Sequence, residues 1–246
     1  MPQAPLDPGP RLEPIAENLW GAEHDLFLPG GVHFRGRMTV VRLAHGGLVL
    51  HSPIPIDTEL SEELAQLGPV EHVVAPNSMH HVHLTSGLQR YPQARLYGPG
   101  LLAKKRSDLT FLDVTNPDTL DFGSEFRPLH IRGVPKLDEV VFLHAPTQTL
   151  VVTDYFFNIR ECQGWLTPWV LRMTGTYRRF AQSRLWRWVL EDRPLAQTSA
   201  EELLAWRFQR IVPAHGEVVS DNAHEQAENA LAWLLGKAPK ALPHPS

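Results

Sequence analysis

The amino-acid sequence predicts an α/β protein with four layers, an αβ/βα sandwich in which two sheets pack together and helices cover their outer faces. Two observations predict this class. Short β-rich runs come in two batches along the chain, and each batch is followed by segments with helical periodicity. In the first batch, residues 72–97 also have the order strand, loop, helix, strand, which is typical of a βαβ unit.

The first batch begins with a predicted hairpin. A turn that contains two glycines joins the β-rich residues 38–43 and 48–51. A helix follows, with Thr58 as its cap and Gly68 as its stop. The strand at residues 72–75 then leads into a loop that is rich in histidine.

The second batch completes the predicted sandwich. Its elements, in chain order, are strands at 126–131, 140–143 and 149–153, a helical stretch at 165–188 broken near Gly175, a helix that begins at Ser199, a strand at 211–213 and a helix capped by Asp221. No linker or internal repeat divides the chain. One domain is therefore expected over residues 1–246, with the Pro-rich residues 1–14 and 237–246 as loose arms.

Composition narrows the classes of function. The 246 residues are 43% hydrophobic and 20% charged with a net charge of −4, which argues against a nucleic-acid-binding or anionic-membrane surface. Cys162 is the single cysteine, so no intramolecular disulfide is expected. The N-terminal residues do not resemble a secretory signal, and no apolar run is long enough for an integral membrane segment. These observations predict a cytoplasmic protein.

Candidate metal ligands follow three of the predicted strands. His80 and His81 lie in the histidine-rich loop, Asp154 follows the last strand of the second batch, and His215 follows the short strand near the C-terminus. Each residue alone is typical of a turn or a helix cap. Strand ends, however, hold side chains at one edge of a sheet with little backbone freedom, which a preorganised metal site requires.

The order of these segments is similar to that of the metallo-β-lactamase superfamily. The chain resembles a divergent branch of it, a domain of unknown function with a degenerate metal-binding motif, over roughly residues 17 to 220. The segments that carry the resemblance are Leu19-Trp20, residues 37–43, residues 51–55, residues 74–77, residues 91–95 and residues 153–158. The resemblance implies a metallo-β-lactamase-like fold.

The T-H-x-H-x-D-H loop of the superfamily is only partly present. When its last two positions are placed on His80 and His81, its two earlier histidines fall on Pro76 and Ser78, which do not replace imidazole on zinc. A later histidine of the pattern, expected near residues 133–137, is missing as well. The resemblance therefore implies that the first of the two metal positions is lost.

The second metal position keeps residues that can bind a metal. The resemblance places it on His80, His81, Asp154 and His215, and a competing alignment pairs His80 with His83 instead. Imidazole and carboxylate both bind first-row metals. The expected cofactor is therefore one divalent metal, with zinc favoured over iron or manganese, or none.

These ligands imply a mononuclear metal-dependent hydrolase of an ester, thioester, lactone or phosphoester, because a bound metal acts as a Lewis acid. Asp154 holds the bridging place in the family pattern and is the expected catalytic residue, orienting the attacking water. The alternative is a non-catalytic ligand-binding or scaffold protein that has lost its metals. Both hypotheses include a small-molecule substrate or ligand and no nucleic acid, and they leave a homodimer open.

Residues 165–188 are rich in tryptophan and arginine. They could cover the site as a lid, or pack against a partner chain or lipid. The favoured interpretation is that the tryptophans lie in the core while the arginine side chains extend around them to water. Glu139 could act as an acid or base near the site, but a surface position is favoured.

Overall fold

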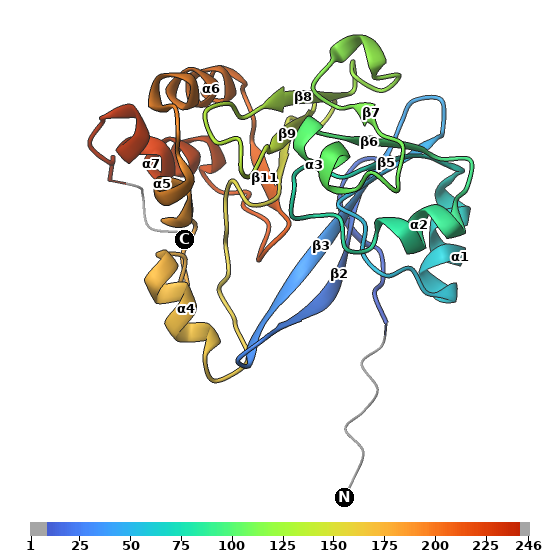
Figure 1. Cartoon of the computed structure of the whole chain (residues 1–246), viewed down its shortest axis with the longest axis horizontal. Coiled ribbons are helices and arrows are strands. Elements are labelled where there is room, and N and C mark those ends of the chain that lie inside the picture. Colours follow the sequence, from blue (N-terminus) through green and yellow to red (C-terminus); the bar gives the residue numbers. More distant parts are fainter. Residues whose placement is uncertain (1–8, 242–246) are drawn as a thin grey trace, which may run out of the picture.

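Two sheets form the centre of the protein. The computed structural model describes residues 9–241, which Figure 1 shows in colour. The first sheet has the strand order β1-β2-β3-β4-β5-β6-β7, and the second has the order β11-β10-β9-β8. The strands are β1 (Glu13–Ala16), β2 (Leu19–Leu28), β3 (Val32–Arg42), β4 (Leu48–His51), β5 (Val70–Val74), β6 (Arg95–Gly98), β7 (Leu112–Asp113), β8 (Phe126–His130), β9 (Val140–His144), β10 (Thr149–Val152) and β11 (Arg210–Pro213).

Helices cover the outer face of each sheet. The helices of the described residues are α1 (Thr58–Leu67), α2 (Leu84–Arg90), α3 (Gly100–Lys105), α4 (Thr167–Thr174), α5 (Leu185–Val189), α6 (Arg193–Ala205) and α7 (Ala223–Leu235). Figure 1 shows α1, α2 and α3 beside the first sheet and α6 and α7 beside the second. This arrangement confirms the predicted four-layer class.

Side-chain alternation in β4 shows why the layers form. Leu48 and Leu50 pack with residues of α1, whereas Val49 packs toward the second sheet. Because successive side chains of a strand point to opposite faces, a strand that is apolar at every position must be covered on both sides. The core between the sheets therefore continues across both, from Val49 in the first sheet to Val151 in the second.

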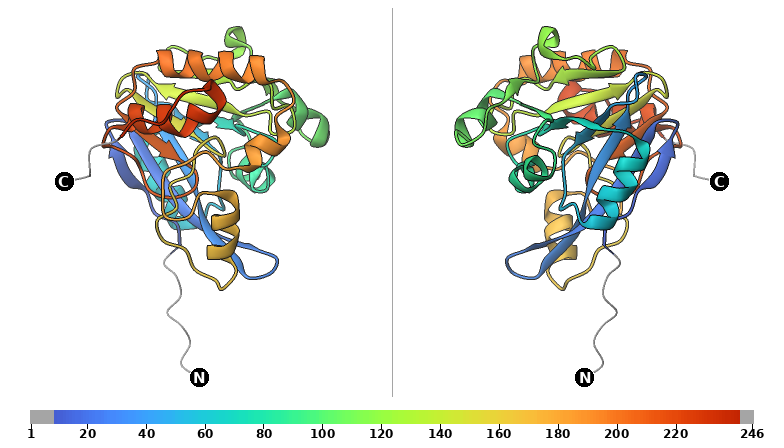
Figure 2. Two further views of the ribbon diagram at one scale, coloured as in Figure 1. Left: turned by 90° about the vertical axis from the view of Figure 1, so that its left-hand side faces the viewer. Right: turned by 90° about the vertical axis from the view of Figure 1, so that its right-hand side faces the viewer.

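The hairpin of β2 and β3 is longer than the sequence indicated. The sequence predicts a strand that starts at residue 38. In the structure β3 starts at Val32 and pairs antiparallel with all of β2. Gly30 and Gly31 form the turn with φ values of 83° and 78°, a backbone conformation that favours glycine. The hairpin extends well beyond the rest of the first sheet (Figures 1 and 2).

Helix starts differ from the prediction where another capping residue competes. The helix expected from Ser199 starts at Arg193, because the Asp192 carboxylate accepts a hydrogen bond from the backbone N–H of Leu195 and proline occupies the first turn. The N-cap of α1 is Asp57 rather than Thr58. Likewise, the N-cap of α7 is Asn222 rather than Asp221.

The tryptophan- and arginine-rich stretch is only partly helical and only partly buried. It forms α4 and α5, and Gly175 ends α4 in the left-handed conformation. Trp186 is buried as expected, but Trp165, Trp169 and Trp188 are exposed. The interpretation of these tryptophans as core residues is therefore wrong for three of them, because Trp165 lies in the loop before α4 and only one side of each short helix packs against the body.

The described parts of the two expected arms contact the body. Arg11 pairs with Glu59 of α1, and the backbone N–H of Leu12 donates to Glu63 at 2.8 Å. The backbone N–H of Lys240 donates to Asn229 of α7 at 2.7 Å. Residues 1–8 and 242–246 of these arms lie outside the described residues. None of the described helices has the length and apolar character needed to cross a membrane.

Two buried histidines predict a loss of stability in mild acid. Burial lowers the pKa of His72 and of His144 to about 4, whereas the same side chains titrate near 6.5 when unfolded. Between pH 6.5 and 4 the unfolded state therefore binds more protons, and the free energy of unfolding falls, by up to about 3 kcal/mol for each histidine. Urea unfolding of the wild type and of His72→Leu at pH 7 and pH 4.5 measures this loss. We expect a smaller loss in the variant, and equal losses would contradict the assignment.

Candidate metal centre

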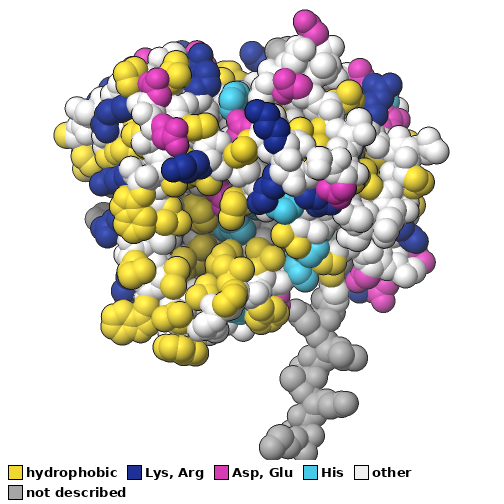
Figure 3. Space-filling model, in the orientation of Figure 1, with side chains coloured by type: hydrophobic (Ala, Val, Ile, Leu, Met, Phe, Trp, Pro, Cys, Tyr) yellow, Lys and Arg dark blue, Asp and Glu magenta, His cyan; other side chains and the backbone are white. Residues whose placement is uncertain are grey.

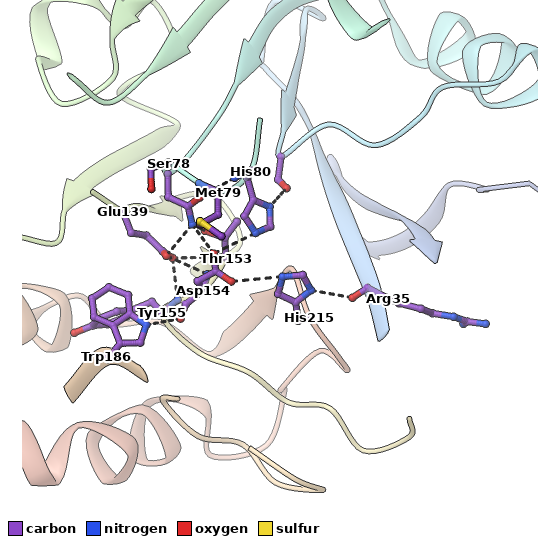
Figure 4. Close-up of polar contacts among 12 residues, drawn as sticks. Arg35, Ser78, Met79, His80, Glu139, Thr153, Asp154, Tyr155, Trp186 and His215 are labelled. Carbon is purple, nitrogen blue, oxygen red and sulfur yellow. Dashed lines mark hydrogen bonds and ion pairs between the residues drawn. The ribbon is translucent and has the colours of Figure 1, made fainter. Parts of the chain in front are cut away.

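Three strand ends bring the candidate ligands together. β10 and β11 are parallel neighbours, with Val152 opposite Pro213, so Asp154 and His215 leave the second sheet at the same edge. β5 of the facing first sheet leads into the loop that carries His80. Figure 4 shows the three side chains pointing toward one another. The convergence therefore follows from strand order and from the packing of the two sheets.

Their distances define a compact cluster. His80 Nε2 lies 3.4 Å from Asp154 Oδ2, and His215 Nε2 lies 3.5 Å from Asp154 Oδ1. One ligand atom from each residue lies within 4.8 Å of the others. The side chains are 13%, 18% and 6% exposed for His80, Asp154 and His215, so the cluster is mostly buried but open to a small molecule.

Hydrogen bonds orient both imidazoles. His215 Nδ1 lies 2.9 Å from the carbonyl oxygen of Arg35, which accepts only, so Nδ1 carries the proton in the neutral ring and Nε2 offers a lone pair. His80 Nδ1 lies 2.6 Å from Ser52 Oγ. Ser52 follows β4 with a φ of 56°, an unusual conformation for a non-glycine residue. Both rings therefore direct Nε2 toward Asp154.

The spacing between these groups suits a metal better than direct hydrogen bonds. A direct N–H···O hydrogen bond is about 2.9 Å long. Around zinc bound at about 2.0–2.1 Å, by contrast, tetrahedral neighbours lie about 3.3–3.4 Å apart. The observed distances of 3.4 Å to Oδ2 and 3.5 Å to Oδ1 are closer to the second geometry, although each histidine faces a different carboxylate oxygen. Two imidazoles and a carboxylate are also ligands that zinc, iron and manganese accept.

Asp154 is held as an anion. Burial by itself would raise the pKa of its carboxyl, but the charge of His80 and the close contacts with both histidines outweigh burial and hold that pKa well below its usual range. Burial lowers the pKa of His215, but its contact with Asp154 prevails and raises it. The Asn77 amide donates to Asp154 Oδ2 at 2.8 Å. The carboxylate is therefore ionised and fixed in direction.

Glu139 corrects the sequence interpretation. It was expected at the surface, but it is fully buried and its carboxylate accepts hydrogen bonds from the backbone N–H groups of Thr153, Asp154 and Tyr155, each 3.0 Å long. Burial and the nearby Asp154 carboxylate raise the pKa of Glu139, although the N–H donors oppose this. Glu139 thus shapes the turn that carries Asp154. Its sequence signal was weak, because Glu139 directly precedes a fully buried strand without any motif of its own.

His81 does not join the cluster. The group of possible metal ligands that the described residues bring together is His80, Asp154 and His215, without the predicted His81. Lys105 and Arg106 lie close enough to His81 to contribute, after burial, to lowering its pKa. His83, the other candidate, packs edge-on against His24, with ring centroids 5.4 Å apart. Among the described residues, only His80 of this loop belongs to the cluster.

The residues at the first metal position have other roles. Ser78 donates through Oγ to the carbonyl oxygen of Lys136 at 2.9 Å, and the carbonyl of Pro76 accepts from the N–H of Val140. Between them, the Asn77 amide donates to Asp154 and to Glu139, which lies 3.2 Å away. The NH2 group of an amide has no lone pair for a cation, and the Asn77 Oδ1 atom already accepts hydrogen bonds from the backbone N–H groups of Met79 and His80. These residues therefore do not fit a second metal ion.

An open cavity of about 490 Å³ lies beside the cluster. Its lining includes Phe34, whose ring meets His215 edge-on, and Gly216, the next residue along the chain. Arg35, Arg160 and Glu217 also line it, so its wall carries both signs of charge. The cavity is large enough for a small molecule, but His80, Asp154 and His215 do not line it, so it approaches the cluster through neighbours of His215 such as Phe34 and Gly216.

Replacing Glu139 tests its structural role. Glu139→Leu leaves three buried N–H groups without an acceptor, so we expect the free energy of unfolding to fall by about 3 kcal/mol or more. Glu202→Gln is the matched control, because the Glu202 carboxylate pairs with Arg132 at the surface. The control is expected to lose less than about 1 kcal/mol. Urea unfolding of both variants measures the difference, and similar losses would refute this role.

Comparisons with known proteins agree with the geometry. Residues 17–105 match the family model described as a domain of unknown function, DUF4336. No curated protein matches the sequence. The similarity to solved structures covers more of this chain than the family model does.

Those structures share the fold at low sequence identity. The metallo-β-lactamase from Pontibacter korlensis is 16% identical, with a TM-score of 0.60 over 93% of this chain and 100% of its own. The DIM-1 metallo-β-lactamase exposed to ceftazidime is 13% identical, with a TM-score of 0.63 over 91% of this chain and 96% of its own. The metal-soaked Flv1 flavodiiron core from Synechocystis sp. PCC6803 is 15% identical, with a TM-score of 0.65 over 92% of this chain and 61% of its own. The protein therefore has the metallo-β-lactamase fold, and residues 17–105 carry the sequence pattern of DUF4336.

Proposed function

We propose that the protein is a hydrolase that works with a single divalent metal ion held by His80, Asp154 and His215. The spacing of the three side chains carries the proposal, because their closest N···O distances of 3.4 and 3.5 Å suit neighbouring ligands of one ion. The tautomer of His215 supports it further, since its Nε2 lone pair faces the carboxylate. Zinc is the first choice for such a ligand set, followed by iron or manganese.

The residues of the cluster have separate tasks in this proposal. A bound divalent ion supplies Lewis-acid chemistry that polarises an ester, thioester, lactone or phosphoester. His80 and His215 would bind this ion through their Nε2 atoms. Asp154 stays ionised over the working pH range because its pKa is low, so a carboxylate oxygen can accept a hydrogen bond from the attacking water and orient it. Asn77 limits rotation of that carboxylate by donating to Oδ2.

The lactamase and flavodiiron neighbours suggest metal chemistry, but the proposal does not extend to two metals. Asn77, Pro76 and Ser78 stand where a second ion would need ligands, and their polar groups are used in hydrogen bonds. We therefore favour activated substrates, which one ion suffices to hydrolyse, over β-lactams. A cavity lined by charged residues of both signs beside His215 suits a small polar substrate.

Metal content and activity test the function together. Purified wild-type protein is expected to hold near one equivalent of zinc, iron or manganese by elemental analysis. A His80→Ala/His215→Ala double variant is expected to lose it, because two of the three ligands are gone. Asp154→Asn is expected to lower hydrolysis of aryl esters and thioesters by about a hundredfold or more, since it removes the charged ligand of the ion as well as the carboxylate that accepts a hydrogen bond from the water.

The neighbouring histidine provides the control. His81→Ala changes the same turn outside the cluster, so it is expected to retain both metal and activity. A wild-type protein that binds no metal, and whose melting temperature is unchanged by zinc and by chelators, would exclude the metal site and favour a non-catalytic ligand-binding protein. Bound metal without hydrolysis of any substrate class would exclude only the catalytic part.

Ser52 is expected to act as a positioning residue for His80. Removing a hydrogen-bond partner of a metal-binding histidine typically weakens metal binding about 10- to 100-fold. Ser52→Ala should therefore raise the zinc dissociation constant by a factor in that range, measured by competition with a coloured chelator. Ser61→Ala replaces another buried serine, which lies on α1 and contacts Tyr91. An equal effect of the two substitutions would remove the role assigned to Ser52.

A further inference from the structure

A group of large apolar side chains lies exposed at the end of the long hairpin and on the helices beside it. Trp165, Trp169 and Trp188 are 75%, 65% and 70% exposed. Figure 3 shows hydrophobic side chains gathered in the lower left part of this face. We define the aromatic face by its exposed members, which are Phe27, Leu28, Trp165, Trp169, Met173, Leu185 and Trp188.

The hairpin and α4 form one connected support for this face. The backbone N–H of His33 donates to Thr167 Oγ1 at 2.8 Å, and His33 forms a β-bridge with Gln163. The Trp165 indole packs so closely on Gly31 that a Cβ there would lie 2.7 Å from its Nε1 atom. Figure 2 shows α4 alongside the hairpin in both views. The exposed rings are therefore held in place rather than carried on a free loop.

The segment that carries most of the aromatic face is positively charged. No aspartate or glutamate occurs between Glu161 and Glu191, whereas five arginines do, in a chain whose net charge is −4. All five are exposed, and within residues 9–241 none of them forms a salt bridge, although the guanidinium groups of Arg172 and Arg187 lie over the rings of Tyr177 and Trp233. They are Arg172, Arg178, Arg179, Arg184 and Arg187. The acidic groups on the hairpin, by contrast, are paired, since Arg35 contacts both Glu23 and Asp25.

Helical spacing places arginine and apolar side chains on the same sides. In α4, Trp169, Arg172 and Met173 are all exposed and stand at positions i, i+3 and i+4. At α5, Arg184, Arg187 and Trp188 repeat this spacing. Residues three and four apart lie next to each other on a helix surface. Each helix therefore presents a tryptophan together with guanidinium groups.

We propose that the aromatic face binds the surface of an anionic lipid bilayer. Tryptophan favours the boundary between headgroups and acyl chains, and unpaired arginines attract anionic headgroups. Short amphipathic elements of this kind lie on a membrane without crossing it. The low overall charge of the chain does not oppose binding, because charges act within about a Debye length of the surface.

The charges also favour lipid over a second copy of the chain. A two-fold symmetric dimer through this face would bring five arginines of each copy together without an acidic partner in the segment. The phosphate groups of a bilayer are anionic, so they would attract the arginine side chains instead of repelling them. The inference does not depend on a metal at the cluster.

Vesicle sedimentation tests the proposal. The full-length protein is mixed with vesicles of phosphatidylcholine alone or of equal parts phosphatidylcholine and phosphatidylglycerol. We expect sedimentation with the anionic vesicles only, weakening as salt is added. Trp165→Ser/Trp169→Ser removes two exposed rings, and Arg172→Gln/Arg187→Gln removes two charges. Each arginine is expected to account for about a fivefold loss in the partition coefficient, so the second variant should bind more than tenfold more weakly.

Controls separate the proposal from its competitors. Leu101→Ser/Arg207→Gln alters an exposed leucine and an exposed arginine outside the aromatic face, so it should bind vesicles like the wild type. Circular dichroism confirms that each variant is folded. Failure of the wild type to sediment with anionic vesicles, or equal losses in control and test variants, would overturn the proposal. A dimer in light scattering that the tryptophan variant converts to a monomer would assign the face to a second copy instead.

Discussion

The candidate site depends on the hydrogen bonds between one buried carboxylate and the turn after β10. Glu139 stands at the start of β9, beside that turn, and accepts hydrogen bonds from three successive backbone N–H groups at residues 153–155. Without an acceptor those groups would be buried and unpaired, which is costly in a protein interior. Because the turn cannot relax, the Asp154 side chain is aimed between the two sheets.

Both histidines of the cluster are also held in one orientation by hydrogen-bond partners. A free imidazole rotates and exchanges tautomers, but His215 is tied by the Arg35 carbonyl and His80 by Ser52. Phe157 stacks on the His215 ring with an interplanar angle of 9°, which limits rotation of that ring further. The partners come from β3, from the end of β4 and from the turn after β10. Both sheets therefore hold the cluster, and its geometry is a property of the sandwich rather than of any one loop.

Sequence reasoning succeeded where the signal is periodic or topological. Two batches of short strands, each followed by helices, predicted two packed sheets, and the positions of His80, Asp154 and His215 after strands predicted that they meet. It did not separate His81 from His80, which alone of the two belongs to the cluster, because the directions of neighbouring side chains in a turn depend on local dihedral angles that the pattern does not encode. It failed for Glu139 because burial of a carboxylate becomes visible only when its backbone donors are known.

The tryptophan-rich segment shows a further limit of composition. A net charge of −4 argued against an anionic surface as a partner, yet the segment between Glu161 and Glu191 carries five positive charges and no negative one. Electrostatic attraction acts locally, since screening confines it to about 8–10 Å at physiological salt. Trp186 also links this surface to the cluster, because its indole N–H donates to the Asp154 carbonyl while Leu185 and Trp188 beside it face outward. A molecule that is held at the aromatic face therefore lies against the same short helix that supports the backbone of Asp154.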